Sequence, residues 1–218
     1  GGGKEKVEDH SRVLGMMLHP FHSTKHYSSY GRFFTNTETL KEVIKEMRKV
    51  IKPSDRVVDF SCGANEWCSM VKSELGLDFV SFDLFLPKDP TNYIRKNWFD
   101  VTADDIRNGF RDKCGKPWKK DDELIIGLNP PFGFQNKQAK KFVQHAISFM
   151  PRLLVLIIPT LEYESPPVPD RKKYKRVHRN DALTRNSIFY IPGCAGQSHT
   201  IGTHTTPELL IYERIGGR

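Results

Sequence analysis

The chain has 218 residues, of which 38% are hydrophobic, and its 34 Lys and Arg outnumber its 26 Asp and Glu for a formal charge of +8. This length and composition allow one sizeable core. The longest apolar run, Leu153–Ile158, is far shorter than the roughly 20 residues of a membrane-spanning helix. No apolar segment follows the first charges, so we expect neither a membrane protein nor a secreted one. The positive charge favours a polyanionic partner but does not establish one.

The four cysteines show no Cys-x-x-Cys spacing and no pattern typical of a zinc site or a disulfide framework. Four of the eight histidines fall within residues 4–34, without a carboxylate or thiol at ligand spacing. We therefore predict a reduced, intracellular protein without a metal site. Residues 1–29 are predicted as an irregular lead-in and 30–218 as one folded domain. The opening triple glycine indicates a domain cut from a longer protein.

A helix is predicted to begin at Thr37, because apolar residues recur from Leu40 to Ile51 at spacings of three and four. Beyond Pro53, short β-rich runs alternate with amphipathic stretches, which favours a mainly parallel sheet with helices on both faces. Seven strands are predicted: Arg56–Phe60, Phe79–Phe82, a weak one at Trp98–Val101, Leu124–Leu128, Leu153–Ile158, Ser187–Ile191 and Leu209–Tyr212. Two further helices are predicted, over Glu66–Leu75 and Lys137–Phe149. Only a loop separates the last two strands, so we expect them to form an antiparallel pair at one edge.

In open parallel sheets, ligands bind beyond the carboxyl ends of the strands. The turn after the first strand, from Asp59 to Glu66, is rich in small residues but matches neither Gly-x-Gly-x-x-Gly nor a phosphate-binding loop, so a nucleoside triphosphate is not supported. A tight turn with exposed N–H groups beside Asp59 suits a nucleoside that carries an amino acid. After the second predicted strand, Asp83 can accept hydrogen bonds from two ribose hydroxyls. After the third, Asp100 can accept one from an adenine amino group.

The fourth predicted strand leads into Asn129-Pro130-Pro131-Phe132. Two successive prolines fix the backbone and remove its donors, so the Asn129 side-chain oxygen and the Pro130 carbonyl can accept the two hydrogens of an exocyclic amine. The lone pair of that amine then faces an electrophilic methyl group, while Phe132 stacks on the base. No strong base is needed, because the proton leaves late.

These motifs resemble those of the S-adenosylmethionine-dependent amino methyltransferases that act on adenine in nucleic acids. Asn129–Phe132 is similar to their Asn/Asp-Pro-Pro-Tyr/Phe motif, Asp59–Asn65 to their cofactor turn, and Gly31–Asn36 to their upstream Gly-x-Phe/Tyr-Phe-Thr-Pro motif. The resemblance implies a Rossmann-like methyltransferase fold, with a seven-stranded, mostly parallel sheet and an antiparallel edge. It also implies S-adenosyl-L-methionine as cofactor, with these candidate binding residues: Phe34, Thr35, Asp59, Ser61, Gly63, Asn65, Asp83, Leu84 and Asp100.

Nearly the whole chain resembles the methyltransferase-like domain of the plant "enhanced downy mildew" chromatin regulators. The similarity lies in Tyr30–Thr35, Val58–Asn65, Phe82–Phe85, Gly127–Gly133 and Phe189–Gly193. This resemblance implies a nuclear protein, with the cytoplasm as the alternative. It also implies additional domains or a protein partner in the full-length chain.

Asn65 stands where most of these enzymes have the second glycine of the cofactor turn. Asn tolerates a left-handed backbone better than other non-glycine residues, so the turn can form. We expect the Asn65 side chain to enter the space of the methionine moiety.

A basic segment follows the proline-rich Ser165–Pro169 and is predicted as a loop over 165–186. We expect this segment at the same end of the sheet as Asn129, where it would follow a phosphate backbone beside the target base. The alternative is a solvated loop or a nuclear-import signal. The candidate nucleic-acid contacts are Arg171, Lys172, Lys173, Lys175, Arg176 and Arg179.

The leading hypothesis is therefore methyl transfer from S-adenosylmethionine to the N6 amine of adenine in RNA or DNA. Asn129, Pro130, Pro131 and Phe132 are the predicted catalytic residues. A second hypothesis is an inactive nucleic-acid- or protein-binding module that keeps the fold. A third is methylation of a small amine or a protein amide by the same four residues.

Overall fold

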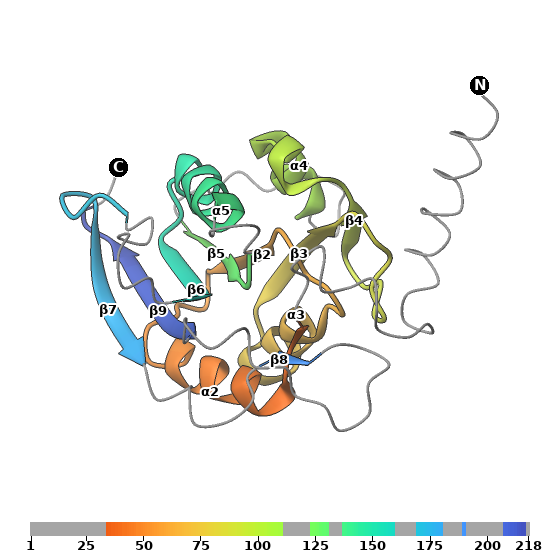
Figure 1. Ribbon diagram of the computed structural model, residues 1–218, viewed down its shortest axis with the longest axis horizontal. Coiled ribbons are helices and arrows are strands. Elements are labelled where there is room, and N and C mark those ends of the chain that lie inside the picture. The colour runs from red at the N-terminus through yellow and green to blue at the C-terminus, as the bar shows by residue number, and fades with distance from the viewer. Residues whose placement is uncertain are drawn as a thin grey trace.

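The computed structural model describes residues 34–110, 123–130, 137–159, 169–180, 189–190 and 207–216 (Figure 1). Its centre is a seven-stranded sheet with the order β4-β3-β2-β5-β6-β9-β7. The strands are β2 (Arg56–Asp59), β3 (Asp78–Asp83), β4 (Tyr93–Arg95), β5 (Leu124–Leu128), β6 (Leu153–Pro159), β7 (Tyr174–Asn180) and β9 (Pro207–Arg214). Neighbours from β4 to β6 are parallel, and β9 runs antiparallel to both β6 and β7. The seven-stranded, mostly parallel, Rossmann-like sheet with an antiparallel edge is thus confirmed.

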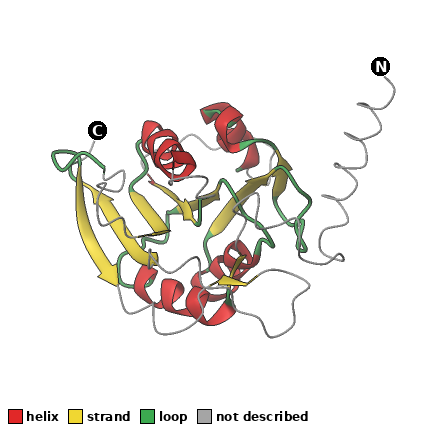
Figure 2. Cartoon of the chain, in the orientation of Figure 1, coloured by secondary structure: helices red, strands yellow, loops and turns green. Residues whose placement is uncertain are grey.

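Helices cover both faces of this sheet (Figure 2). On one face lie α2 (Thr37–Met47) and α3 (Glu66–Met70), which continues as a π-helical turn, η3 (Val71–Leu75). On the other lie α4 (Ala103–Gly109), α5 (Lys137–Ser148) and the 3-10 turn η4 (Trp98–Asp100). Each face has its own core, because successive strand residues alternate between faces: Val57 and Val155 pack on the α2 side, Val58 and Leu154 on the α5 side. No helix among the described residues is long and apolar enough to cross a membrane.

Local sequence signals fix the helix starts. The Asn36 side chain accepts a hydrogen bond from the Thr39 N–H at 2.8 Å and caps α2. Thr102 and Asp105 form a capping box at α4. A separate two-stranded sheet pairs β1 (Phe34–Thr35) with β8 (Phe189–Tyr190) in antiparallel register. This small sheet places Phe34 and Thr35 next to the site described below.

Three element predictions are wrong. The third strand is β4, at Tyr93–Arg95, because the Asn97 side chain accepts the Phe99 N–H and turns Trp98–Asp100 into a 3-10 helix. Strand β8 does not pair with β9. Part of the predicted basic loop is strand β7, whose buried Tyr174 holds it against the sheet while charged residues face solvent at the sheet edge.

Candidate active site

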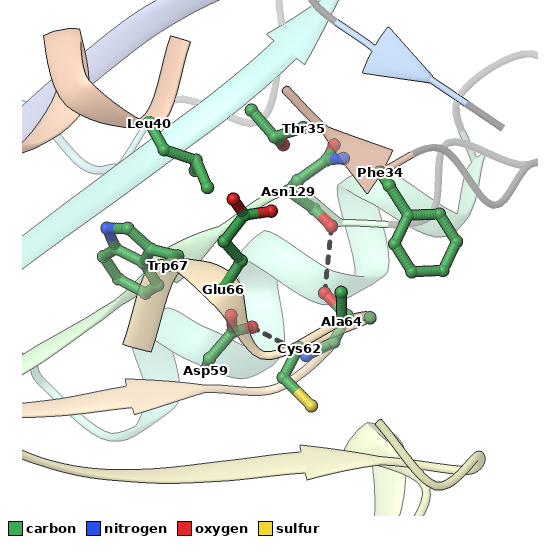
Figure 3. Close-up of a pocket in the computed structure, with 11 residues that line it drawn as sticks. Phe34, Thr35, Leu40, Asp59, Cys62, Ala64, Glu66, Trp67 and Asn129 are labelled. Carbon is green, nitrogen blue, oxygen red and sulfur yellow. Dashed lines mark hydrogen bonds between the residues drawn. The ribbon is translucent and has the colours of Figure 1, made fainter. Parts of the chain in front are cut away.

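A pocket opens at the carboxyl end of the sheet, where β2 and β5 end (Figure 3). Phe34, Thr35 and Asn129 form one wall of it. Asp59, Glu66 and Trp67 form the other. The described residues that line it are Phe34, Thr35, Leu40, Asp59, Ser61, Cys62, Gly63, Ala64, Glu66, Trp67 and Asn129. Its volume is about 40 Å³, space for the end of a ligand such as an amino-acid group rather than a whole nucleoside.

Ser61 joins the turn after β2 to the turn after β5. Its N–H donates to Asp59 Oδ1 at 2.9 Å, and its hydroxyl donates to the backbone oxygen of Asn129, also at 2.9 Å. The two residues joined by the hydroxyl are 68 positions apart in the sequence. The start of the Asn-Pro-Pro-Phe motif therefore lies directly beside the predicted cofactor turn, and Pro130 behind it is buried.

Asp59 is an almost completely enclosed carboxyl group, 4% exposed. Its pKa is raised to about 8, chiefly by burial; the hydrogen bond from the Ser61 N–H opposes this rise, and the negative charge of Asp83 adds to it. A cationic ligand group beside Asp59 would favour the ionised carboxylate. The pocket is therefore suited to an ammonium group.

Asp83 holds the turn from the neighbouring strand. Its Oδ2 accepts the Gly63 N–H at 3.0 Å and its Oδ1 accepts the Phe85 N–H at 3.1 Å. Gly63 has a φ of 56°, and a Cβ there would lie 3.1 Å from the Phe34 ring. A side chain at this position would therefore close the space between the turn and β1.

Asn65 adopts the left-handed backbone expected of it, with a φ of 64°. The expectation that its side chain enters the methionine space is wrong. Its Nδ2 donates to the backbone oxygens of Asp89 at 2.8 Å and Thr91 at 3.0 Å, so the side chain lies against the loop after β3. Asn65 therefore fastens that loop to the turn after β2.

Some pocket residues were not predicted. Glu66 is the first residue of α3, and its Oε1 accepts the Thr37 hydroxyl at 2.7 Å, which links α2 to the pocket. Trp67 is buried against Gly127 of β5, where a Cβ would lie 2.7 Å from the ring. The position of Glu66 directly after the small-residue turn could have identified it. The other unpredicted lining residues are Leu40, Cys62 and Ala64.

Other predicted site residues lie outside this pocket. Leu84 follows Asp83 and is 46% exposed. Asp100 is the exposed last residue of η4, so its assignment to a strand end is wrong. Burial lowers the pKa of His145 in α5, and the negative charge of Asp100 opposes this shift. Pro131 and Phe132 lie outside the described residues. Within the described part of the chain, no three His, Cys, Asp or Glu side chains gather to hold a metal ion.

Only the end of the basic segment lies where the whole segment was expected. Arg179 pairs with Leu210 of β9, which pairs with Leu156 of β6, so Arg179 is near the carboxyl end of the parallel strands. Strand β7 begins opposite Arg214, the last residue of β9, and therefore at the amino end of the parallel strands. Arg171, Lys172 and Lys173 precede it, at the end of the sheet opposite Asn129. Of the remaining cations, Lys175 pairs with Glu213 at 2.9 Å and Arg179 with Glu208 at 2.6 Å. Arg176 is exposed.

Several solved structures are similar to this chain. Human structures that resemble the fold include the N-terminal domain of METTL16 in complex with SAH, with 11% identity, a TM-score of 0.46, and coverage of 95% of this chain and 83% of that chain. The human methyltransferase 10 domain containing protein has 12% identity and a TM-score of 0.45, and the match covers 96% of this chain and 95% of that one.

A curated relative is the Arabidopsis thaliana protein ENHANCED DOWNY MILDEW 2, which is 32% identical over 191 residues. The match covers 84% of this chain but 14% of that protein, so the chain spans a small part of its relative. The model of the EDM2 methyltransferase-like domain matches residues 50–216, which include β2 to β9 and most of the pocket. The chain therefore belongs to the EDM2 methyltransferase-like domain family.

Proposed function

We propose that this domain binds S-adenosylmethionine and transfers a methyl group to the exocyclic N6 amine of adenine in RNA or DNA. The observation that carries the proposal is the hydrogen bond from the Ser61 hydroxyl to the Asn129 backbone oxygen. It brings the residues suited to a cofactor and the residues suited to a target amine into one pocket. Membership of a methyltransferase-like family supports the same activity.

The chain's own residues fit the cofactor. Gly63 leaves a cradle beside Phe34 that a Cβ would fill. Asp59 and Glu66 supply carboxylates for the α-ammonium group, and Asp83 supplies acceptors for the ribose hydroxyls. When bound, the cofactor supplies an electrophilic methyl group on a sulfonium. Thr35 and Leu84 are further proposed contacts, at the methionine end and beside the ribose.

Asn129 and Pro130 act on the target base. The Asn129 side-chain oxygen and the Pro130 carbonyl accept the two hydrogens of the N6 amine, which turns its lone pair out of the ring plane. Phe132 stacks on the adenine, and Pro131 keeps the turn rigid. The amine loses its proton to solvent after the methyl group has been transferred, so no strong base is required.

The biological setting is also part of the proposal. We infer a nuclear protein that acts on nucleic acid as one domain of a longer chain, in line with the family resemblance and the small share of the relative that this chain covers. The alternative, an inactive binding module, rests on two observations: the chromatin-family resemblance and the expectation of an Asn65 side chain in the cofactor space. Because that side chain lies against residues 89–91, it gives no ground for inactivity.

Calorimetric titration with S-adenosylmethionine and S-adenosylhomocysteine tests the cofactor site. Wild type should bind both, and Asp83→Ala should bind at least about tenfold more weakly because a charge-assisted acceptor worth roughly 1.5–3 kcal/mol is lost. Asp104→Ala, an exposed carboxylate of α4, is the control and should bind as wild type does. No binding at millimolar cofactor would contradict the proposal for the isolated domain.

Methyl transfer to single-stranded, adenine-containing RNA and DNA tests the catalytic residues. Asn129→Ala should bind the cofactor normally and lose transfer by about 10²-fold or more, the effect of removing a preorganised polar group. A radiolabelled methyl group recovered as N6-methyladenine by nucleoside analysis is the readout. Labelled protein instead of labelled nucleic acid would favour amide methylation, and equal transfer by Asn129→Ala would overturn the assigned role.

A further inference from the structure

Three exposed cations precede β7 at the amino end of the sheet, and we call Arg171, Lys172 and Lys173 the basic turn. Asp170 fixes its shape: its backbone oxygen accepts the N–H groups of Lys173 and Tyr174, both at 2.8 Å, and its Oδ1 accepts the Lys172 N–H at 2.9 Å. The Lys173 oxygen accepts the Ile215 N–H at 2.7 Å, which ties the turn to the end of β9. The basic turn is therefore held in a defined position.

Tyr174 anchors the turn to the body of the domain. Its side chain is 2% exposed, and its hydroxyl donates to the Pro151 backbone oxygen at 2.9 Å. The neighbouring cations are not equivalent to those of the turn. Lys175 and Arg179 are neutralised by Glu213 and Glu208, whereas none of the three cations of the basic turn forms an ion pair within the described residues. The turn is thus an anchored group of three cations that outnumber the one carboxylate beside them, Asp170.

The basic turn and the pocket lie at opposite ends of the sheet. In Figure 1, β7 begins at the upper left, whereas β8 lies toward the bottom, and its partner strand β1 contributes Phe34 and Thr35 to the pocket. A strand of seven residues, such as β7, spans about 20 Å. Strands β6 and β9 lie between β5 and β7, so β7 is three strand spacings away from β5. At about 4.8 Å per spacing, the lateral distance is about 14 Å. The straight separation is therefore about 25 Å.

We propose that the basic turn is a second, distant docking site for the phosphate backbone of the nucleic acid whose adenine enters the pocket. The inference rests on the proposed function in taking nucleic acid as the ligand. Phosphodiester groups complement three exposed cations that form no ion pair with any described residue, and flexible single strands can reach round the sheet to them. Stacked nucleotides rise about 3.4 Å each, so a strand that passes round the sheet, over a path of about 34 Å, needs roughly ten nucleotides to reach from the pocket to the turn.

The test is a length series of single-stranded RNA and DNA oligonucleotides of 4, 8, 12 and 20 nucleotides, each with one adenine near one end. Affinity should rise sharply between 4 and 12 nucleotides for wild type. The variant R171A/K172A/K173A should bind the 12-mer about tenfold or more weakly at physiological salt, and the 4-mer as wild type does. Its salt dependence, log K against log salt, should be shallower by about 2, the expectation for three phosphate contacts on a single strand.

A charge-matched control removes three cations from exposed ion pairs elsewhere: K45A/K72A/R107A. It should keep the length dependence and most of the salt slope, because those cations are already neutralised and lie on other elements. If it loses affinity as much as the turn variant does, the effect is one of net charge and the inference fails. Unchanged 12-mer binding by the turn variant overturns it as well.

The two proposals fail in distinguishable ways. Length-dependent binding without methyl transfer would leave the docking site standing and overturn the proposed catalysis. Methyl transfer to the 4-mer and the 12-mer with equal KM would support the proposed catalysis and overturn the docking site. Poly-glutamate gives a third outcome. If it displaces the 12-mer from wild type at concentrations that leave the 12-mer bound to the turn variant, the turn binds an acidic protein segment instead.

Discussion

At the scale of single residues, Asn65 combines two tasks that a glycine cannot. Its backbone supplies the left-handed conformation of the turn, with a φ of 64°, and its buried side chain donates two hydrogen bonds to the loop after β3. That loop follows Asp83, the proposed ribose acceptor. The identity of residue 65 therefore controls how firmly the carboxyl ends of β2 and β3 are held together.

Asn65→Gly should keep the turn and loosen the loop. We expect the free energy of unfolding to fall by about 1–3 kcal/mol, because glycine retains the backbone conformation and loses two buried hydrogen bonds. Urea denaturation measures this change, and hydrogen exchange of the amides of residues 84–92 should quicken. Asn92→Gly is the matched control, since Asn92 also has a positive φ of 51° and is exposed; it should change stability little. Equal effects of the two substitutions would refute the proposed anchoring.

Asp59 gives the molecule a particular dependence on pH. Because its pKa is raised to about 8 in the folded state, from about 4 in the unfolded state, its contribution to stability is complete below pH 4 and is lost as pH rises to 8. Asp59→Asn keeps an acceptor for the Ser61 N–H and cannot ionise. Relative to this variant, wild type should therefore lose stability between pH 5 and 8, by a few kcal/mol in total.

Urea denaturation of wild type and Asp59→Asn at several pH values measures that difference. Asp78→Asn is a useful comparison, because the Lys72 hydrogen bond lowers the pKa of Asp78. Asp78 therefore makes the free energy of unfolding vary with pH only at acidic pH, and not between pH 5 and 8. Parallel stability curves for wild type and Asp59→Asn from pH 5 to 8 would show that Asp59 does not titrate in this range.

At the scale of elements, the apolar runs predicted the sheet well and the charged edge poorly. Strands β5 and β6 are buried on both faces, so continuous apolar sequence identifies them. Strand β7 has one buried tyrosine amid Lys and Arg, a pattern that local sequence does not distinguish from a loop. The pairing of β8 with β1 depends on a contact between distant segments, which periodicity does not contain.

The same reasoning explains which pocket residues were found. Asp59 is the last residue of β2 and Asn129 directly follows β5, so the rule about carboxyl ends identifies them. Glu66 and Trp67 enter the pocket from a helix, and their direction depends on how α3 packs on β5, where Gly127 makes room for the Trp67 ring. The direction of the Asn65 side chain depends on the position of residues 89–91. Such contacts between elements are set by packing and are not visible in a motif.

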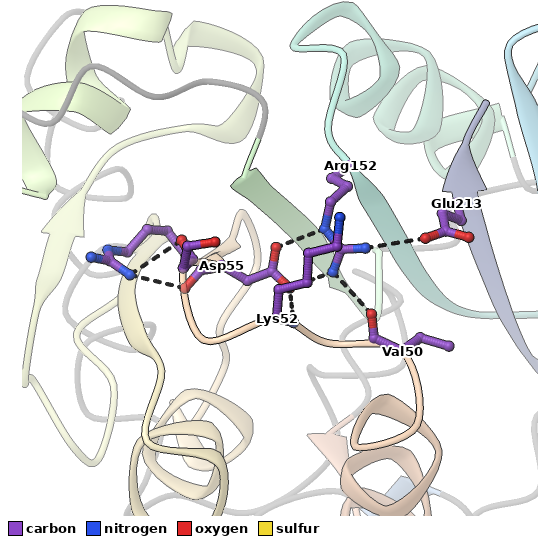
Figure 4. Close-up of polar contacts among 7 residues, drawn as sticks. Val50, Lys52, Asp55, Arg152 and Glu213 are labelled. Atoms are coloured by element: carbon purple, nitrogen blue, oxygen red, sulfur yellow. Dashed lines mark hydrogen bonds and ion pairs between the residues drawn. The ribbon is translucent and has the colours of Figure 1, made fainter. Parts of the chain in front are cut away.

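At the scale of the whole molecule, a buried ion pair at the amino end of the sheet connects segments that are far apart in the sequence (Figure 4). The Arg152 guanidinium, before β6, makes two hydrogen bonds to Asp55, before β2. It also donates to the Val50 backbone oxygen at 3.0 Å and contacts Glu213 of β9 at 3.3 Å. Asp55 is fully buried and Arg152 is 7% exposed. Segments from the first, middle and last parts of the described chain therefore meet at one guanidinium.

Arg152→Met should destabilise the domain by about 3–5 kcal/mol, because it leaves the Asp55 carboxylate buried without its partner. Lys72→Met breaks the exposed pair with Asp78 and should cost at most about 1 kcal/mol. Urea denaturation measures both losses, and Asp55→Asn combined with Arg152→Met should recover part of the first. Because Arg152 lies at the end of the sheet opposite the pocket, cofactor affinity of the folded fraction should stay unchanged. Similar losses for the two single substitutions would show that the buried pair contributes no more than a surface pair.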